Sequence, residues 1–233
     1  MIHYTGQLSE ILLEPYQNAT LRVSLPAVAH PQPGQYMLVN QPGNYDQTFP
    51  LTCYPALAPS SVDDADLVTL LADVPAELSP GLSLAFTAPR GRPFSLPKNI
   101  ERLLCWSQSK RPAFLLPFIS QALTQSCSVV LLSDQELVGI PIEAEVQPLA
   151  MQTELIVWSQ IFLVEISIQE LDPALTLLAE LPKATLKKGF VLLSGEFPCG
   201  GSADCGLCTI RAGTKDFLPC KTGPLLPLNK LVS

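Results

Sequence analysis

Short apolar runs separated by turn residues fill the first hundred positions of the chain. Residues 21–25 (LRVSL) alternate apolar and polar side chains, which is the pattern of a strand with one buried face. Further apolar runs lie at residues 36–39, 67–71 and 82–86. Pro-Gly pairs at 33–34 and 80–81 mark turns between the runs. Regularly spaced strands with such turns predict a small antiparallel β-barrel over residues 1–98.

The pattern changes after residue 98, where apolar runs begin to alternate with helical segments. The predicted strands lie at 103–106, 129–132, 155–158 and 190–193, and the predicted helices at 113–125 and 173–180. This alternation predicts a parallel α/β layer over residues 99–193, with 190–193 as its last strand. Residues 194–233 are rich in Gly, Cys and Pro and are predicted to be loop-like. The predicted fold class is therefore α+β with several domains, the last of which needs a cofactor or a partner to form a core.

Composition indicates a folded chain and narrows its partners. Hydrophobic residues make up 47% of the 233 positions, which is enough for real cores. The net charge is −7 and basic residues do not cluster, so nucleic acid is not an expected partner, whereas a basic docking face would suit the chain. No targeting segment is visible at the start, and polar residues interrupt the apolar stretch 155–168. We therefore expect a cytoplasmic protein without direct membrane insertion.

Four of the seven cysteines crowd into the last segment of the chain. They are Cys199, Cys205, Cys208 and Cys220. Thiolates are the usual ligands of iron–sulfur clusters, and a plant-type site takes three of them from one loop and a fourth from further along the chain. Glycines at 200, 201 and 206 let the backbone approach an inorganic core closely. This spacing predicts a 2Fe–2S cluster held by the four cysteines.

Two other interpretations of this segment stay open. The gap between the first two cysteines is one residue longer than in the plant-type spacing, and a C-x2-C pair also begins zinc ribbons. Zinc ribbons usually contain two such pairs, and this segment contains one. Free or disulfide-linked thiols are the remaining alternative. Cys53, Cys105 and Cys127 have no spacing pattern and are predicted to be small buried hydrophobic residues.

Several short motifs follow one another in the order of a known family. Residues 33–36 (PGQY) are similar to its P-G-Q-[FY] motif, and residues 49–52 (FPLT) stand where its flavin motif R-P-[IL]-S occurs. Other similar segments are 78–81 (LSPG), 88–94 (APRGRPF), 194–196 (SGE) and 220–224 (CKTGP). In these motifs the chain resembles the electron-transfer subunit of dihydroorotate dehydrogenase, an enzyme of pyrimidine biosynthesis. That subunit belongs to the ferredoxin-reductase superfamily.

The resemblance implies a three-part molecule and a function. Residues 1–98 would form a flavin-binding-like barrel, 99–193 a nucleotide-binding-like α/β domain, and 194–233 the cluster-binding segment. Electrons in the family pass between a catalytic subunit and NAD through the cluster and FAD, and the cofactors supply the chemistry. The implied partner is another redox subunit, either a flavoprotein or a dehydrogenase catalytic subunit. Pro50 and Thr52 are the flavin contacts that the resemblance retains.

Two departures from the family pattern affect the cofactors. Phe49 replaces the arginine of the flavin motif, so a cation that pairs with phosphate becomes an apolar ring. Residues 106–112 (WSQSKRP) contain no glycine where the family has a Gly-rich turn for the pyrophosphate. Lys110 and Arg111 in this stretch are either an anion site or part of a solvated loop. The sequence thus leaves FAD binding open and predicts that NAD does not bind.

Two functions from different classes fit these observations. The first is an iron–sulfur electron-transfer subunit, with or without FAD, inside a redox complex. The second is a non-catalytic accessory or scaffold subunit that keeps the cluster but has lost flavin and NAD binding. Because the sequence shows no nucleophile with a base and no phosphate loop, no catalytic residue is expected in the chain itself.

Overall fold

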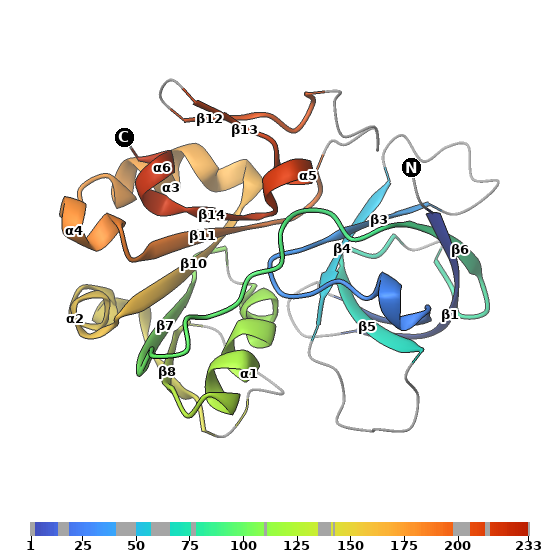
Figure 1. The fold of residues 1–233 in the computed structure, drawn as a ribbon, viewed down its shortest axis with the longest axis horizontal. Coiled ribbons are helices and arrows are strands. Elements are labelled where there is room, and N and C mark those ends of the chain that lie inside the picture. Colours follow the sequence, from blue (N-terminus) through green and yellow to red (C-terminus); the bar gives the residue numbers. More distant parts are fainter. Residues whose placement is uncertain are drawn as a thin grey trace.

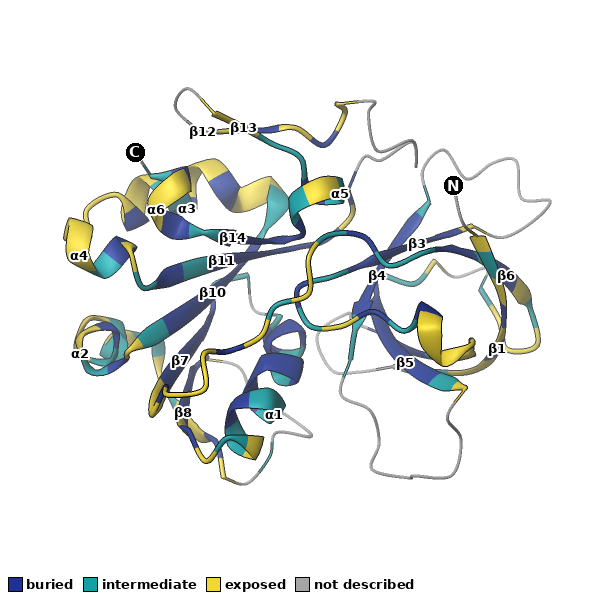
Figure 2. Ribbon diagram, in the orientation of Figure 1, coloured by how far each residue is buried: buried dark blue, intermediate teal, exposed yellow. Residues whose placement is uncertain are grey.

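The computed structural model places a β-barrel beside an α/β layer (Figure 1). It describes residues 3–13, 19–40, 50–56, 66–75, 78–109, 111–134, 141, 143–197, 206–212 and 215–232. Strands of both parts are mostly buried, whereas the outward sides of the short helices are exposed (Figure 2). The barrel and the α/β layer therefore each have a core, as the apolar runs predicted.

Six antiparallel strands close into the barrel in the order β1-β2-β5-β4-β3-β6. They are β1 (His3–Leu13), β2 (Ala19–Ser24), β3 (Met37–Asn40), β4 (Leu51–Pro55), β5 (Leu67–Ala72) and β6 (Ser83–Thr87), with the short η2 turn (Ala27–Ala29) after β2. β6 pairs with β1, so the described sheet has no free edge. The predicted antiparallel barrel is confirmed.

The strands of the barrel wall that face the α/β layer are apolar on both sides. Met37 and Val39 of β3 point into the barrel core, whereas Tyr36 and Leu38 belong to the core of the α/β layer. Tyr54 of β4 also lies in that second core. Because side chains alternate between the two faces of a strand, one stretch of wall contributes to both cores. The barrel and the layer are thus packed directly against each other.

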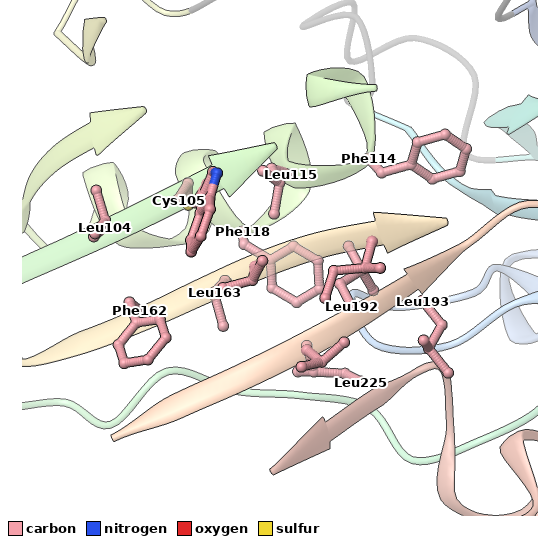
Figure 3. Close-up of a cluster of buried hydrophobic side chains, with 14 of the residues drawn as sticks. Leu104, Cys105, Phe114, Leu115, Phe118, Phe162, Leu163, Leu192, Leu193 and Leu225 are labelled. Atoms are coloured by element: carbon pink, nitrogen blue, oxygen red, sulfur yellow. The ribbon is translucent and has the colours of Figure 1, made fainter. Parts of the chain in front are cut away.

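A six-stranded sheet forms the centre of the α/β layer, in the order β14-β11-β10-β7-β8-β9. Its strands are β7 (Arg102–Ser107), β8 (Ser128–Leu132), β9 (Glu145–Gln147), β10 (Ile161–Ser167), β11 (Gly189–Ser194) and β14 (Leu225–Pro227). All neighbours are parallel except β14, which runs antiparallel to β11. The parallel strands follow the order of a doubly wound nucleotide-binding fold. Figure 3 shows part of the core, with Leu104, Leu163 and Leu193 on neighbouring strands.

The connecting helices are short. They are η3 (Pro112–Leu115), α1 (Leu116–Thr124), η4 (Leu149–Met151), α2 (Gln152–Trp158), η5 (Ile168–Glu170), α3 (Leu171–Leu178) and α4 (Lys183–Leu186). The predicted helices at 113–125 and 173–180 correspond to η3 with α1 and to α3. Among the residues that the structure describes, no helix is long and apolar enough to cross a membrane.

The strand predicted at 155–158 is wrong. These residues form the end of α2, and the strand is β10, which begins at Ile161. Ile156 is buried while its neighbour Val157 is 78% exposed, as expected for a helix with one buried face. β10 is instead buried from Phe162 to Ile166, which is usual for a central parallel strand. A four-residue apolar run fits either element, so the error came from choosing the wrong run.

The chain after residue 194 is more structured than its composition predicted. It forms a hairpin of β12 (Ile210–Ala212) and β13 (Lys215–Phe217), followed by α5 (Pro219–Thr222), β14 and α6 (Leu228–Leu231). β14 adds to the edge of the sheet, so residues 190–193 are not its last strand. Leu226 and Leu228 of this stretch are almost completely buried. The last residues therefore belong to the α/β core, because their leucines complete its edge.

Candidate functional site

The order of the parallel strands marks one place in the sheet as a ligand site. From β7 the chain winds outward through β8 and β9, and it then crosses to β10 on the other side of β7, so the winding direction reverses between β7 and β10. In open α/β sheets, ligands bind beyond the carboxyl ends of the strands at this switch point. Ser107 at the end of β7 lies opposite Glu165 of β10 at that position. The candidate site is therefore the region around these two residues, at the carboxyl ends of β7 and β10.

Glu165 lies at the centre of this region and is fully buried. The Ser107 hydroxyl donates a hydrogen bond of 3.0 Å to its carboxyl group. The hydroxyls of Ser109 and Ser194 also donate to it, and the Gln108 amide donates to the Glu165 carbonyl oxygen at 3.0 Å. Burial raises the pKa of Glu165, and the three hydroxyl donors oppose the rise by stabilising the charged form. A carboxyl group of the chain itself thus occupies the switch point.

Sequence reasoning missed Glu165 as a functional candidate. The residue appeared only as a polar interruption of an apolar run, one of the arguments against a membrane span. The available signal was a single acidic residue within a strand that is otherwise continuously buried, since an ionisable group in such a position needs partners. Its partners come from two other strand ends and a loop, so the sequence could not name them.

Arg111 is paired within the protein. Its guanidinium donates to the Asp73 carboxylate at 2.8 Å, and both side chains are about three-quarters buried. Asp73 follows β5 of the barrel and Arg111 precedes η3, so the pair connects the barrel to the α/β layer. The sequence left two interpretations of Lys110 and Arg111, an anion site or a solvated loop. Arg111 fits neither interpretation, because its partner is a carboxylate inside the protein. Lys110 lies outside the described residues.

Thr52 and Tyr54 of β4 bind the segment that leads to the cysteines. The Phe197 amide donates to the Thr52 hydroxyl oxygen at 3.1 Å, and the Tyr54 hydroxyl donates to the Gly195 carbonyl oxygen at 2.7 Å. Burial is the main cause that raises the pKa of Tyr54, so its hydroxyl keeps the proton that it donates. Thr52, Tyr54 and Phe197 are at most 3% exposed. Barrel and α/β layer are therefore joined by buried hydrogen bonds at this position.

The two flavin contacts that the sequence suggested lie in β4 and just before it. Thr52 is 2% exposed and its hydroxyl accepts the Phe197 amide. Pro50, just before β4, is half-buried. Phe49 lies outside the described residues.

Two of the predicted cluster ligands are described, and the hairpin β12–β13 brings their segments together. Ile210 pairs with Phe217 at the open end of the hairpin. Cys208 stands two residues before this pair and Cys220 three residues after it, so both lie at that end. Cys208 is 3% exposed and Cys220, on α5, is half-buried. Cys199 and Cys205 lie outside the described residues, and the remaining described residues contain no group of three potential metal ligands.

The turn after Cys220 packs against two loops of the barrel. A Cβ atom added to Gly91 would lie 2.3 Å from the Gly223 Cα atom, and one added to Gly223 would lie 2.7 Å from the Gly34 carbonyl oxygen. All three glycines have φ between +84° and +99°. They come from the family-like motifs at 33–36, 88–94 and 220–224. Motifs that are far apart in the sequence therefore meet beside Cys220, and only glycine fits at the contact.

Two cysteines that lie inside the cores and outside the cysteine segment are expected to be chemically inert. Cys53 and Cys105 are completely buried, and burial raises the pKa of both thiols far above the ordinary value. Iodoacetamide should leave both residues unmodified in the native protein and should alkylate both in urea, as measured by peptide mass spectrometry. Modification of either residue at native conditions would contradict the described packing.

Known structures share this arrangement of barrel and α/β layer. An NADH-dependent reduced ferredoxin–NADP oxidoreductase, studied for flavin-based electron bifurcation, has a TM-score of 0.63 at 12% identity, covering 97% of this chain and 89% of that one. The ferredoxin reductase in carbazole 1,9a-dioxygenase has a TM-score of 0.60 at 12% identity, covering 84% of this chain and 68% of that one. The ferredoxin–NADP+ reductase from Plasmodium falciparum has a TM-score of 0.59 at 8% identity, covering 82% and 95%. The chain has a ferredoxin-reductase-like fold.

The likeness confirms the resemblance at the level of the fold. Neither a scan against known protein families nor a search of curated protein sequences finds a match to this chain. At these sequence identities the likeness shows the fold alone.

Proposed function

We propose that this protein is an iron–sulfur electron-transfer subunit with a 2Fe–2S cluster on Cys199, Cys205, Cys208 and Cys220. The observation that carries the proposal is the β12–β13 hairpin, which brings the segments of Cys208 and Cys220 to one end of a ferredoxin-reductase-like fold. Structures with this fold include reductases that pass electrons to or from ferredoxin. Thiolates held by loops are the donors that such a cluster requires.

The protein residues around the cysteines would position the ligands. Cys208 is packed among the buried apolar residues of the α/β core, which holds its thiol in place. Gly206 has a φ of +71°, so the backbone can turn tightly between Cys205 and Cys208. The glycine contacts with Gly34 and Gly91 fix the turn that follows Cys220. When bound, the cluster would supply one-electron transfer, while the surrounding chain would set its distance from a partner.

We further propose that the redox complex resembles dihydroorotate dehydrogenase, with this chain as the non-catalytic subunit. The order of the family-like motifs and the meeting of three of their glycines beside Cys220 support this assignment. An alternative is an accessory subunit in which the retained cluster only stabilises a scaffold. Two observations favour this alternative. The Thr52 hydroxyl and the Glu165 carboxyl group are already hydrogen-bonded within the protein, so neither is left to contact a nucleotide.

The cluster assignment is tested by two ligand variants and a control whose burial matches that of Cys208. Cys208→Ser and Cys220→Ser should lose the visible absorbance of the cluster and its acid-labile sulfide, because serine oxygen is a poor ligand for it. Cys127→Ser is the control, since Cys127 is 4% exposed and lies outside the cysteine segment. Protein purified without oxygen is analysed for iron, sulfide and zinc, and its folding is followed by circular dichroism.

Equal amounts of iron and sulfide in the wild type and their loss in both ligand variants would support the proposal. Zinc without sulfide in the wild type would contradict it and favour a zinc site. A folded Cys208→Ser protein with an unchanged spectrum would remove Cys208 from the ligand set. Electron transfer is separated from a scaffold role by reducing the wild type with dithionite and reoxidising it, since a scaffold needs no reversible change.

A further inference from the structure

Strand β4 of the barrel is in contact with the segment that leads to the cysteines. Its residues alternate between two cores, because Leu51 and Cys53 belong to the barrel core whereas Tyr54 belongs to the core of the α/β layer. Thr52 pairs across the ladder with Leu38, whose side chain also lies in that second core. Thr52 and Tyr54 therefore face the layer from the same side of the barrel wall.

The chain turns at the end of the sheet and reaches these two side chains. β11 ends at Ser194, and Gly195 has a φ of +97°, a conformation that other residues rarely adopt. The Gly195 carbonyl oxygen then accepts the Tyr54 hydroxyl, and the Phe197 amide donates to Thr52. Two barrel side chains that are two residues apart thus bond two backbone groups that are also two residues apart. This matched spacing holds the segment along β4 rather than at a single point.

Phe197 is held by its ring as well as by its amide. The ring is fully buried, and its centroid lies 5.1 Å from that of Tyr36. Cys199 follows two residues later in the sequence. Because two residues of extended chain span at most about 7 Å, the position of Phe197 limits where the Cys199 thiolate can lie. The contact with β4 therefore acts on the first of the four predicted ligands.

We infer that Thr52 and Tyr54 are positioning residues for Cys199 in the proposed cluster. The inference rests on the proposed function. The two side chains act through the backbone of Gly195 and Phe197, where each provides a partner for a buried polar group that would be costly to leave unpaired. Without either bond the segment samples more conformations, and fewer of them place Cys199 correctly. The cluster should then be lost more readily.

Thr52→Val tests the inference, with Thr87→Val as a matched control. Both threonines are 2% exposed, and the hydroxyl oxygen of each accepts a backbone amide at 3.1 Å, which for Thr87 is the amide of Leu38. Valine has a similar shape but no acceptor, so both variants lose the same kind of hydrogen bond. Of the two threonines, only Thr52 bonds the segment that leads to the cysteines. Protein purified without oxygen is mixed with an iron chelator, and the loss of the cluster absorbance is timed.

Thr52→Val should lose the cluster roughly threefold to tenfold faster than the wild type, the factor that one buried hydrogen bond of ordinary strength represents. Thr87→Val should lose it at the wild-type rate, although urea unfolding should show both variants destabilised to a similar extent. Thr52→Ser keeps the hydroxyl and should restore the wild-type rate. Tyr54→Phe should also lose the cluster faster. Because Tyr54 lies outside the flavin-like motif 49–52, this result would exclude an effect that acts through a flavin contact of Thr52.

Equal rates of cluster loss in Thr52→Val and Thr87→Val would overturn the inference, as would a Thr52→Ser protein that loses the cluster as fast as Thr52→Val. If Thr52→Val does not fold, Tyr54→Phe decides, and a wild-type rate in that variant would overturn the inference. A wild type without iron and sulfide would refute the proposed function, and with it the ligand role of Cys199. Hydrogen exchange of the peptide that contains Phe197 then decides the anchoring by β4, which equal exchange in Thr52→Val and Thr87→Val would overturn.

Discussion

Gly91→Ala is expected to lower the free energy of unfolding by about 4 kcal/mol or more, enough to unfold a protein of ordinary stability. The new Cβ atom would lie 2.3 Å from the Gly223 Cα atom and 2.9 Å from the Gly223 nitrogen. These are backbone atoms, so no side chain can rotate away, and the barrel loop must separate from the turn after Cys220. The φ of +84° at Gly91 adds backbone strain for any residue with a Cβ atom.

Gly81→Ala separates the steric clash with Gly223 from the strain of a positive φ. Gly81 has a similar φ of +90°, but a Cβ atom there would meet nothing within 4 Å. This variant should therefore lose only the conformational part, about 1 kcal/mol. Urea unfolding of both variants, followed by circular dichroism, measures the difference. Equal losses would mean that the contact between the barrel and the Cys220 turn contributes nothing to stability.

Gly91→Ala is expected to have a second consequence, at the proposed cluster. The turn that the contact holds begins directly after Cys220, so its release should loosen that ligand. Any iron and sulfide bound by the wild type should therefore be reduced in Gly91→Ala and retained in Gly81→Ala. The comparison requires growth at low temperature, where the destabilised protein stays folded. Full retention in both variants would show that Cys220 is positioned without the barrel.

Glu165→Gln is expected to remove a component of the pH dependence of stability. Burial raises the pKa of Glu165 in the folded protein above its ordinary value of 4.5. Between the two pKa values the folded state keeps a proton that the unfolded state has released. The contribution to stability is therefore complete below pH 4.5, falls by up to about 1.4 kcal/mol per pH unit as the pH rises, and is lost above the folded-state pKa.

Glutamine keeps the shape and the acceptor oxygen of the side chain but cannot ionise. The three serine hydroxyls can turn to suit the amide, because a hydroxyl both donates and accepts. The Gln variant should therefore lack the fall, and it should gain on the wild type as the pH rises. Urea unfolding across a pH series measures both curves, with Glu170→Gln on the exposed η5 turn as control. A Gln variant with the wild-type slope would contradict the assignment to Glu165.

Both experiments examine the boundary between the barrel and the α/β layer. The glycine contact lies beside Cys220, and Glu165 fastens Ser194 at the start of the segment that leads to Cys199. The cysteine segment is therefore held from both ends by groups outside it.

The sequence by itself determined the two main parts of the fold. Alternation over residues 21–25 and continuous apolar runs such as 129–132 report local periodicity, which depends only on neighbours along the chain. The barrel and the parallel layer followed from it, whereas the resemblance to the ferredoxin-reductase superfamily rests on short sequence motifs. The run at 155–158 failed because four apolar residues fit a helix as well as a strand, and the cluster assignment to the four cysteines stays a prediction from spacing.

Only the tertiary structure decided how the parts meet. Glu165, Ser109 and Ser194 are distant in the sequence, and Gly34, Gly91 and Gly223 still more so, yet each set converges at one point. No periodicity encodes such contacts, because they depend on strand order and on which face of a strand meets the next layer. The same reason applies to β14, whose leucines are buried because the strand pairs with β11 at the edge of the sheet. Spacing can therefore name candidate ligands, whereas the packing of Phe197 against Tyr36 and Tyr54 decides what space remains for a cofactor.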